Sequence, residues 1–188
     1  MESTYCDPSL PDGLKAMLDK SRIALSIADG QQDDFPLVGV NEAFCNLTGY
    51  RPEAVLNRNC RFLQPEGGAG PVRDRMRQFL QDHEQDQEKF VIPNEALDGR
   101  RFLNLVYMAK LRRGGEMRYI LGSQFDATRG KAPALSLYEE ALKEDIRRYN
   151  LLADDTGWVM LGSYDALANS HALIAHSTLD QDEPDHPI

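Results

Sequence analysis

The chain has 188 residues, which is enough for one well-buried domain with appended segments and short for two full domains. Its net charge of −9 disfavours a general role in binding nucleic acid or an anionic membrane. The sequence contains no apolar run of about 18 residues and shows no signal peptide, so we expect a cytoplasmic protein that spans no membrane. Three widely spaced cysteines indicate neither a disulfide framework nor a metal site, and they fit a reducing compartment.

The first part of the chain alternates short helical and strand patterns. Asp12 is expected to cap a helix whose apolar residues recur at helical spacing. Asn41 is expected to cap a later helix, which Gly49 ends. The patterns predict a helix at 10–21, strands at 22–28 and 36–40, and short helices at 41–49 and 52–56.

The next segment, residues 57–64, reads Asn-Arg-Asn-Cys-Arg-Phe-Leu-Gln and is rich in polar groups. Phe62 and Leu63 provide apolar anchors beside a thiol, guanidinium groups and carboxamides. An ordinary core segment would not bury so many polar groups, whereas a segment that holds a flat, polar-edged ligand over Cys60 would. A single cysteine taken alone is more often an inert buried thiol, so the surrounding residues carry this interpretation.

A glycine-rich loop and a predicted helix from Pro71 follow this segment. Arg73 and Arg77 are four residues apart and share one face of that helix. Such arginines commonly face solvent. Together with Arg61 they would instead form a phosphate clamp, because each guanidinium is a planar fork of donors.

Three further strands are predicted at 89–94, 101–111 and 118–126. Turns at Asp98-Gly99 and Gly114-Gly115 join them as hairpins. We therefore predict an α+β fold with a five-stranded antiparallel sheet, in which the helical connections lie between the second and third strands.

Carboxamides interrupt these predicted strands. By alternation along a strand, Asn104 lies on the same face as its apolar neighbours, and so does Gln124. Asn94 precedes them on the first strand of the set. A buried amide needs hydrogen-bond partners, and a ring system with carbonyl groups and ring nitrogens would supply them.

The C-terminal part changes in composition. Residues 134–153 and 158–176 have helical periodicity, although the excess of acidic residues there disfavours DNA contact. We predict an N-terminal helical extension at 1–21, a core at 22–129, a C-terminal helical extension at 130–176 and a disordered acidic tail at 177–188.

Residues 59–64, Asn-Cys-Arg-Phe-Leu-Gln, resemble the flavin-binding motif of light-oxygen-voltage (LOV) photoreceptor domains, a branch of the PAS family. Residues 40–44 and 47–50 also resemble that family, and the resemblance covers about residues 22–129. The sequence departs from the family at four positions: Phe35, Asn57, Glu95 and Ile120. At position 57, asparagine replaces a common glycine and tolerates the same left-handed backbone.

The resemblance implies a PAS/LOV fold and a blue-light photoreceptor that binds FMN without a covalent bond in the dark. Under blue light, the Cys60 sulfur would form a reversible adduct with flavin carbon C4a. The resemblance also implies roles for the residues around the ring, with Arg73 as the weaker phosphate candidate. The implied cofactor-binding residues are Asn59, Cys60, Arg61, Gln64, Arg73, Arg77, Asn94, Asn104, Gly122 and Gln124.

The resemblance leaves the output open. The helical extensions are expected to form a homodimer that responds to light and acts on an unknown protein partner, without an enzymatic domain. Three alternatives remain at this stage: a flavin-based redox sensor, a flavoprotein oxidoreductase, and a PAS interaction module without a flavin. Neither a substrate acid–base pair nor a nicotinamide-binding fingerprint is visible, which disfavours the oxidoreductase.

Overall fold

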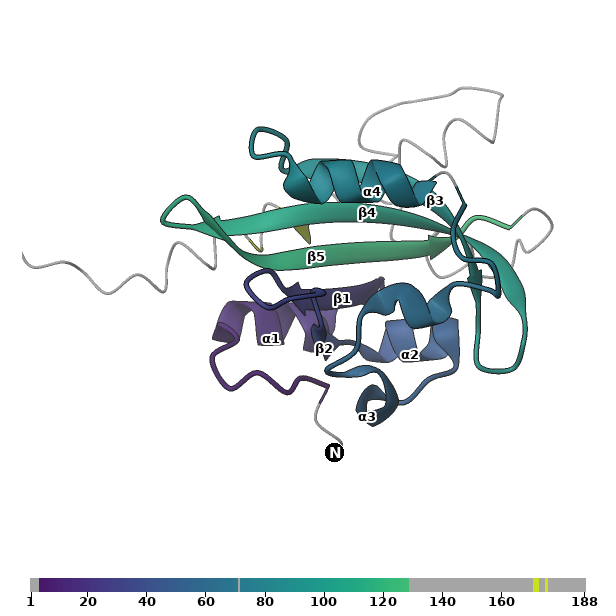
Figure 1. The fold of residues 1–188 in the computed structure, drawn as a ribbon. Helices are drawn as coiled ribbons and strands as arrows, with labels where there is room; N and C mark the ends of the chain where they lie inside the picture. Colours follow the sequence, from purple (N-terminus) through teal and green to yellow (C-terminus); the bar gives the residue numbers. More distant parts are fainter. Residues whose placement is uncertain (1–3, 71, 129–170, 173–174, 176–188) are drawn as a thin grey trace, which may run out of the picture.

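A computed structural model describes residues 4–70, 72–128, 171–172 and 175 (Figure 1). The predicted helical extension and acidic tail after residue 129 lie outside the described residues, apart from 171, 172 and 175. The elements are α1 (Asp12–Lys20), β1 (Ala24–Asp29), β2 (Leu37–Val40), α2 (Glu42–Thr48), α3 (Pro52–Val55), a 3-10 turn η1 (Cys60–Leu63), α4 (Val72–Gln81), β3 (Gln87–Glu95), β4 (Arg101–Arg113) and β5 (Glu116–Asp126).

The strands form one five-stranded sheet in the order β2-β1-β5-β4-β3, and every neighbouring pair is antiparallel. This confirms the predicted α+β fold, including the helical connections between β2 and β3. The first strand pairs with the last, so residues from opposite ends of the core meet at the centre of the sheet. Side chains alternate between two faces, and each face has its own layer of helices.

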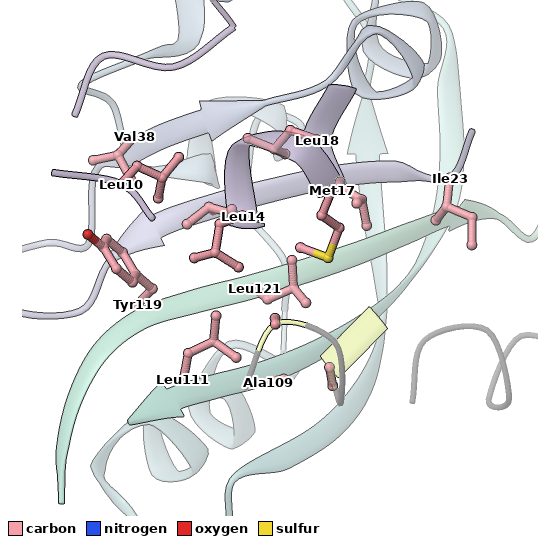
Figure 2. Packing of buried hydrophobic residues seen from close by; sticks show 14 of the residues in the cluster. Leu10, Leu14, Met17, Leu18, Ile23, Val38, Ala109, Leu111, Tyr119 and Leu121 are labelled. Atoms are coloured by element: carbon pink, nitrogen blue, oxygen red, sulfur yellow. The ribbon is translucent and has the colours of Figure 1, made fainter. Parts of the chain in front are cut away.

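Helix α1 covers the outer face of the sheet. Its apolar side chains Leu14, Met17 and Leu18 are buried against residues of the central strands, among them Leu111 and Leu121 (Figure 2). Removal of this apolar surface from water holds α1 on the sheet.

The prediction that Asp12 caps α1 is wrong. Pro11 occupies the cap position and makes no side-chain capping bond, while Asp12 is the first helical residue. The Asp12 carboxylate instead accepts a hydrogen bond from Lys15 Nζ at 3.0 Å. Its negative charge still lies at the positive end of the helix dipole.

The inner face of the sheet is covered by the helical segments between β2 and β3. Phe44 of α2 and Val55 of α3 pack on β1 and β5, and Phe79 of α4 packs on Phe90 of β3. Lys110 of β4 is fully buried, and its ammonium donates to the carbonyl oxygens that follow α4, including that of Gln85 at 3.0 Å. This contact ties the end of α4 to the sheet.

Asn41 caps α2, as the sequence predicted, and it also connects this helix to the sheet. Its Oδ1 accepts from the backbone N–H groups of Phe44 and Leu25, both at 2.9 Å. Its Nδ2 donates to the carbonyl oxygens of Ser21 at 3.1 Å and Ile23 at 2.6 Å. The helix ends at Gly49, whose φ of 77° confirms the predicted left-handed terminus.

We predict that Asn41→Ala lowers the free energy of unfolding by about 2–4 kcal/mol, because it removes a helix cap and leaves buried backbone groups unpaired. Chemical denaturation measures this loss. Asn46→Ala, at an exposed position of the same helix, is the matched control and should change stability by less than about 0.5 kcal/mol. Equal losses in the two variants would contradict the assigned role of Asn41.

Candidate functional site: a cavity between the sheet and the helical layer

A cavity of about 540 Å³ lies between the inner face of the sheet and the helical segments. Apolar side chains form much of its wall, including those of Leu63, Leu80, Ile92 and Ile120. This size and lining are typical of a pocket for a cofactor or another small molecule. All the sequence-predicted site residues line this one cavity, namely Asn59, Cys60, Arg61, Gln64, Arg73, Arg77, Asn94, Asn104, Gly122 and Gln124.

Three buried amides form a hydrogen-bonded row across the cavity wall. Asn104 Nδ2 donates to Asn94 Oδ1 and to Gln124 Oε1, both at 2.8 Å. Asn94 is 4% exposed, Asn104 1% and Gln124 3%, so water has little access to these groups. The strand register creates the row, because Ile92 pairs with Asn104 and Val106 pairs with Gln124.

One atom of this row has no partner. Among the described residues, Asn104 Oδ1 is buried and accepts no hydrogen bond. A buried carbonyl without a donor costs about 1–3 kcal/mol, so a ligand that brings an N–H group to this wall is favoured. The pyrimidine edge of a flavin alternates carbonyl groups with an N–H group. The residues present therefore fit a ring with such an edge.

Cys60 begins the turn η1 on another part of the wall. Asn59 shapes this turn, because its Oδ1 accepts from the backbone N–H of Arg61 at 2.9 Å. Although the Cys60 residue is only half-buried, protein atoms crowd its thiol, and this burial raises the pKa of Cys60 to about 12. The sulfur is therefore protonated at neutral pH.

Arginines gather at another part of the wall. Arg61 donates two hydrogen bonds to the carboxylate of Asp34, each 2.6 Å long, and these bonds lower the pKa of Asp34. Arg73 and Arg77 project from α4 and are exposed, and Arg77 lies 3.6 Å from Asp74 on its own helix. An anion bound here would meet three guanidinium groups, although it would compete with Asp34 for Arg61.

Sequence reasoning missed two polar residues of the wall, Ser26 and Asp34. Ser26 Oγ accepts from Gln124 Nε2 at 2.9 Å. Asp34 has a left-handed backbone with φ of 68°, in a loop whose fold the sequence did not predict. The expected left-handed conformation at Asn57 is confirmed, with φ of 62°.

Comparisons with known proteins agree with this geometry. Residues 26–129 match the family model described as "PAS domain". A blue-light-activated histidine kinase 2 of Erythrobacter litoralis is 39% identical over 111 residues, which are 58% of this chain and 32% of that protein. The chain thus spans about a third of the length of that relative.

Two solved structures are also similar. The LOV domain from the EL346 blue-light-activated histidine kinase of Erythrobacter litoralis is 37% identical with a TM-score of 0.54, and the match covers 58% of this chain and all of that one. The Rhodobacter sphaeroides LOV protein is 26% identical with a TM-score of 0.61, over 88% of this chain and 94% of that one. The chain belongs to the PAS family and, within it, to the LOV domains.

Within the part of the chain that the structure describes, no cluster of His, Cys, Asp and Glu has the geometry to hold a metal ion. A search of the same residues finds no helix with the length and hydropathy needed to cross a membrane.

The raised pKa of Cys60 predicts how stability depends on pH. An unfolded thiol has a pKa of about 8.5, so above that pH the unfolded chain loses a proton that the folded chain retains up to about pH 12. The free energy of unfolding should therefore fall as pH rises through this window. From pH 7 to 10, the wild-type protein should lose about 2 kcal/mol more than Cys60→Ala.

Denaturation curves at the two pH values measure this difference. Cys6→Ala, which removes an exposed thiol, is the control and should reproduce most of the wild-type loss. If Cys60→Ala and the wild type lost the same free energy, the Cys60 thiol would not be held protonated by burial.

Proposed function

We propose that this chain is a blue-light sensor that binds FMN in the cavity and forms a reversible bond between Cys60 and the flavin. One observation carries the proposal: a protonated thiol and a row of buried amides line the same cavity, and one acceptor of that row has no partner. Its membership of the LOV domains and its similarity to blue-light-activated histidine kinases support it.

The amides, arginines and thiol have separate roles in this proposal. Asn94 and Asn104 bind the pyrimidine edge of the flavin, and Gln124 faces N5 and O4. Gln64 binds the ribityl or O2 side, while Arg61 and Arg77, with Arg73 as the weaker candidate, pair with the phosphate. Gly122 and Asn59 complete the wall: a side chain at 122 would collide with Ser26, and Asn59 shapes the turn that presents Cys60.

The bound flavin supplies a ring system that absorbs blue light. Cys60 would then contribute both parts of its thiol: its S–H bond would break, the sulfur would bond to C4a, and the hydrogen would go to N5. This addition needs no other reactant, and its reversal restores the thiol and the flavin. Because the dark thiol is protonated, Cys60 supplies almost no thiolate for attack without light, which favours photochemistry over a thiolate-based redox sensor.

Gln124 is the residue that detects the change. The Gln124 amide has a donor and an acceptor on one planar group, so it could donate to N5 before Cys60 reacts and accept from N5 afterwards. Rotation of that amide exchanges the two. Gln124 lies on β5, two residues before the end of the last strand, so the change reaches the start of the C-terminal segment.

We infer that the output is mechanical rather than catalytic, through helical extensions that pair two copies of the chain. The apolar periodicity of residues 134–153 supports this inference.

We predict that the purified protein is yellow and that blue light reversibly bleaches its blue absorption band. Cys60→Ala should bind flavin with the same dark spectrum and show no reversible bleaching, because the bond to C4a cannot form. Absorption spectra before, during and after illumination test this. Cys45→Ala, at a half-buried cysteine of α2, is the matched control and should bleach as the wild type does. Equal bleaching in Cys60→Ala would contradict the proposal.

A separate prediction concerns the phosphate. Arg77→Gln should weaken FMN binding by roughly tenfold and leave riboflavin binding nearly unchanged, because only FMN has the anion that Arg77 pairs with. Fluorescence titration of flavin-free protein measures both affinities. Arg75→Gln is the control on the same helix, since Arg75 pairs with Glu88 and does not line the cavity. An equal loss for both flavins would remove Arg77 from the phosphate site.

A further inference from the structure

The row of amides continues to a residue that no sequence motif singled out. Ser26 of β1 is 6% exposed, and its hydroxyl oxygen accepts a hydrogen bond from Gln124 Nε2 at 2.9 Å. Ser26 pairs with Gly122 in the β1–β5 ladder, and Ala24 pairs with Gln124, so the hydrogen bond runs diagonally between neighbouring strands. The polar row therefore crosses four strands, from Ser26 through Gln124 and Asn104 to Asn94.

Every member of this row can exchange a donor for an acceptor. An amide does so by rotating about its terminal bond, and a hydroxyl does so by turning its hydrogen. Among the described residues, no hydrogen bond occupies the Ser26 hydroxyl hydrogen, so it can turn without breaking another contact. At the same time, Asn104 retains a buried acceptor, Oδ1, that is not used in the present arrangement.

Reversal of Gln124 has consequences for both of its neighbours. When its amide rotates, Oε1 faces Ser26 and Nε2 faces Asn104. Ser26 must then donate, which its hydroxyl can do. On the other side, Gln124 Nε2 faces Asn104, whose Oδ1 is already proposed to accept from the ring, so Ser26 is the neighbour that can follow the reversal. Alanine or valine at position 26 would leave one end of Gln124 without a partner in either orientation.

Gly122 provides the space for this contact. A Cβ atom at position 122 would lie 2.8 Å from Ser26 Oγ, which is too close for a real side chain. Glycine at 122 therefore allows the Ser26 hydroxyl to lie over β5, within reach of Gln124.

We propose that Ser26 is a positioning residue of the light reaction, which acts through Gln124. In the dark, the Ser26 hydroxyl accepts from Gln124 Nε2 and fixes the orientation of the amide. After Cys60 has bonded, the same hydroxyl donates to Gln124 Oε1 and allows the Gln124 amide to reverse. The inference has two halves. The dark half, that Ser26 fixes the orientation of Gln124, concerns the protein before illumination. The light half, that Ser26 allows Gln124 to reverse, rests on the proposed function.

The dark half is tested by side-chain amide NMR of the full chain, as purified in the dark and with or without flavin. Ser26→Ala should shift the Gln124 side-chain amide signals and speed their hydrogen exchange by roughly tenfold, because Nε2 loses a buried partner. Ser26→Thr, which keeps the hydroxyl, should restore both. Ser123→Ala, at the neighbouring strand position that faces the opposite side of the sheet, is the control. Unchanged Gln124 signals in Ser26→Ala would overturn the proposal.

The light half is tested by the rate at which the blue band recovers in the dark. In Ser26→Ala, the dark orientation of Gln124 has an N–H group without a partner, whereas the reversed orientation has a carbonyl oxygen without one. A buried N–H group without a partner is the more costly of the two, so the variant destabilises the dark orientation more. Ser26→Ala should therefore recover roughly three- to tenfold more slowly, and Ser26→Thr within about twofold of the wild type.

A double-mutant comparison separates this role from a general structural effect. In a Gln124→Leu background, Ser26→Ala should no longer change the recovery rate, because its effect passes through Gln124. The same slowing in both backgrounds, or none in the wild-type background, would overturn the positioning role. If the wild-type protein did not bleach at all, the proposed function would fail together with the light half, and the NMR result would still decide the dark half.

Discussion

The buried amides on the inner face of the sheet impose the constraint on which the rest of this structure depends. A carboxamide away from water must have its hydrogen-bond capacity matched, and the row from Asn94 to Gln124 matches most but not all of it. Apolar packing cannot supply the missing donor at Asn104 Oδ1, whereas a flat ligand with a polar edge can. The strand register holds this row together, because a slip of one residue would turn the amides toward the outer face and α1.

The two layers of helices have different roles on the two faces of this sheet. On the outer face, α1 removes apolar surface from water and keeps the central strands in place. On the inner face, Lys110 fixes the end of α4, and Asn41 fixes the start of α2. These contacts hold α4 and α2 against the inner face of the sheet. Residues of η1 and α4 line the cavity, so Cys60 and the arginines come from segments far in sequence from the amides.

Most of the fold was predictable because its signals are local. Strand alternation, the turn at Asp98-Gly99 and the cap at Asn41 each depend on a few neighbouring residues. The Asp12 cap failed because Pro11 moved the helix start by one residue. The roles of Ser26 and Asp34 were not predicted because they depend on contacts with residues distant in sequence. Ser26 is hydrogen-bonded to a residue 98 positions away, and Asp34 pairs with one 27 positions away. A serine among small residues of a strand gives no sign of such a contact.

One cavity is proposed to hold a flavin between a protonated cysteine and a row of buried amides. A crystal structure of the flavin-loaded protein, grown and measured in the dark, is the decisive measurement. We expect Cys60 Sγ in van der Waals contact with flavin C4a, a donor of the ring on Asn104 Oδ1, and Gln124 bonded to both the ring and Ser26. A sulfur that points away from the ring, or a ring whose polar edge faces away from the amides, would contradict it.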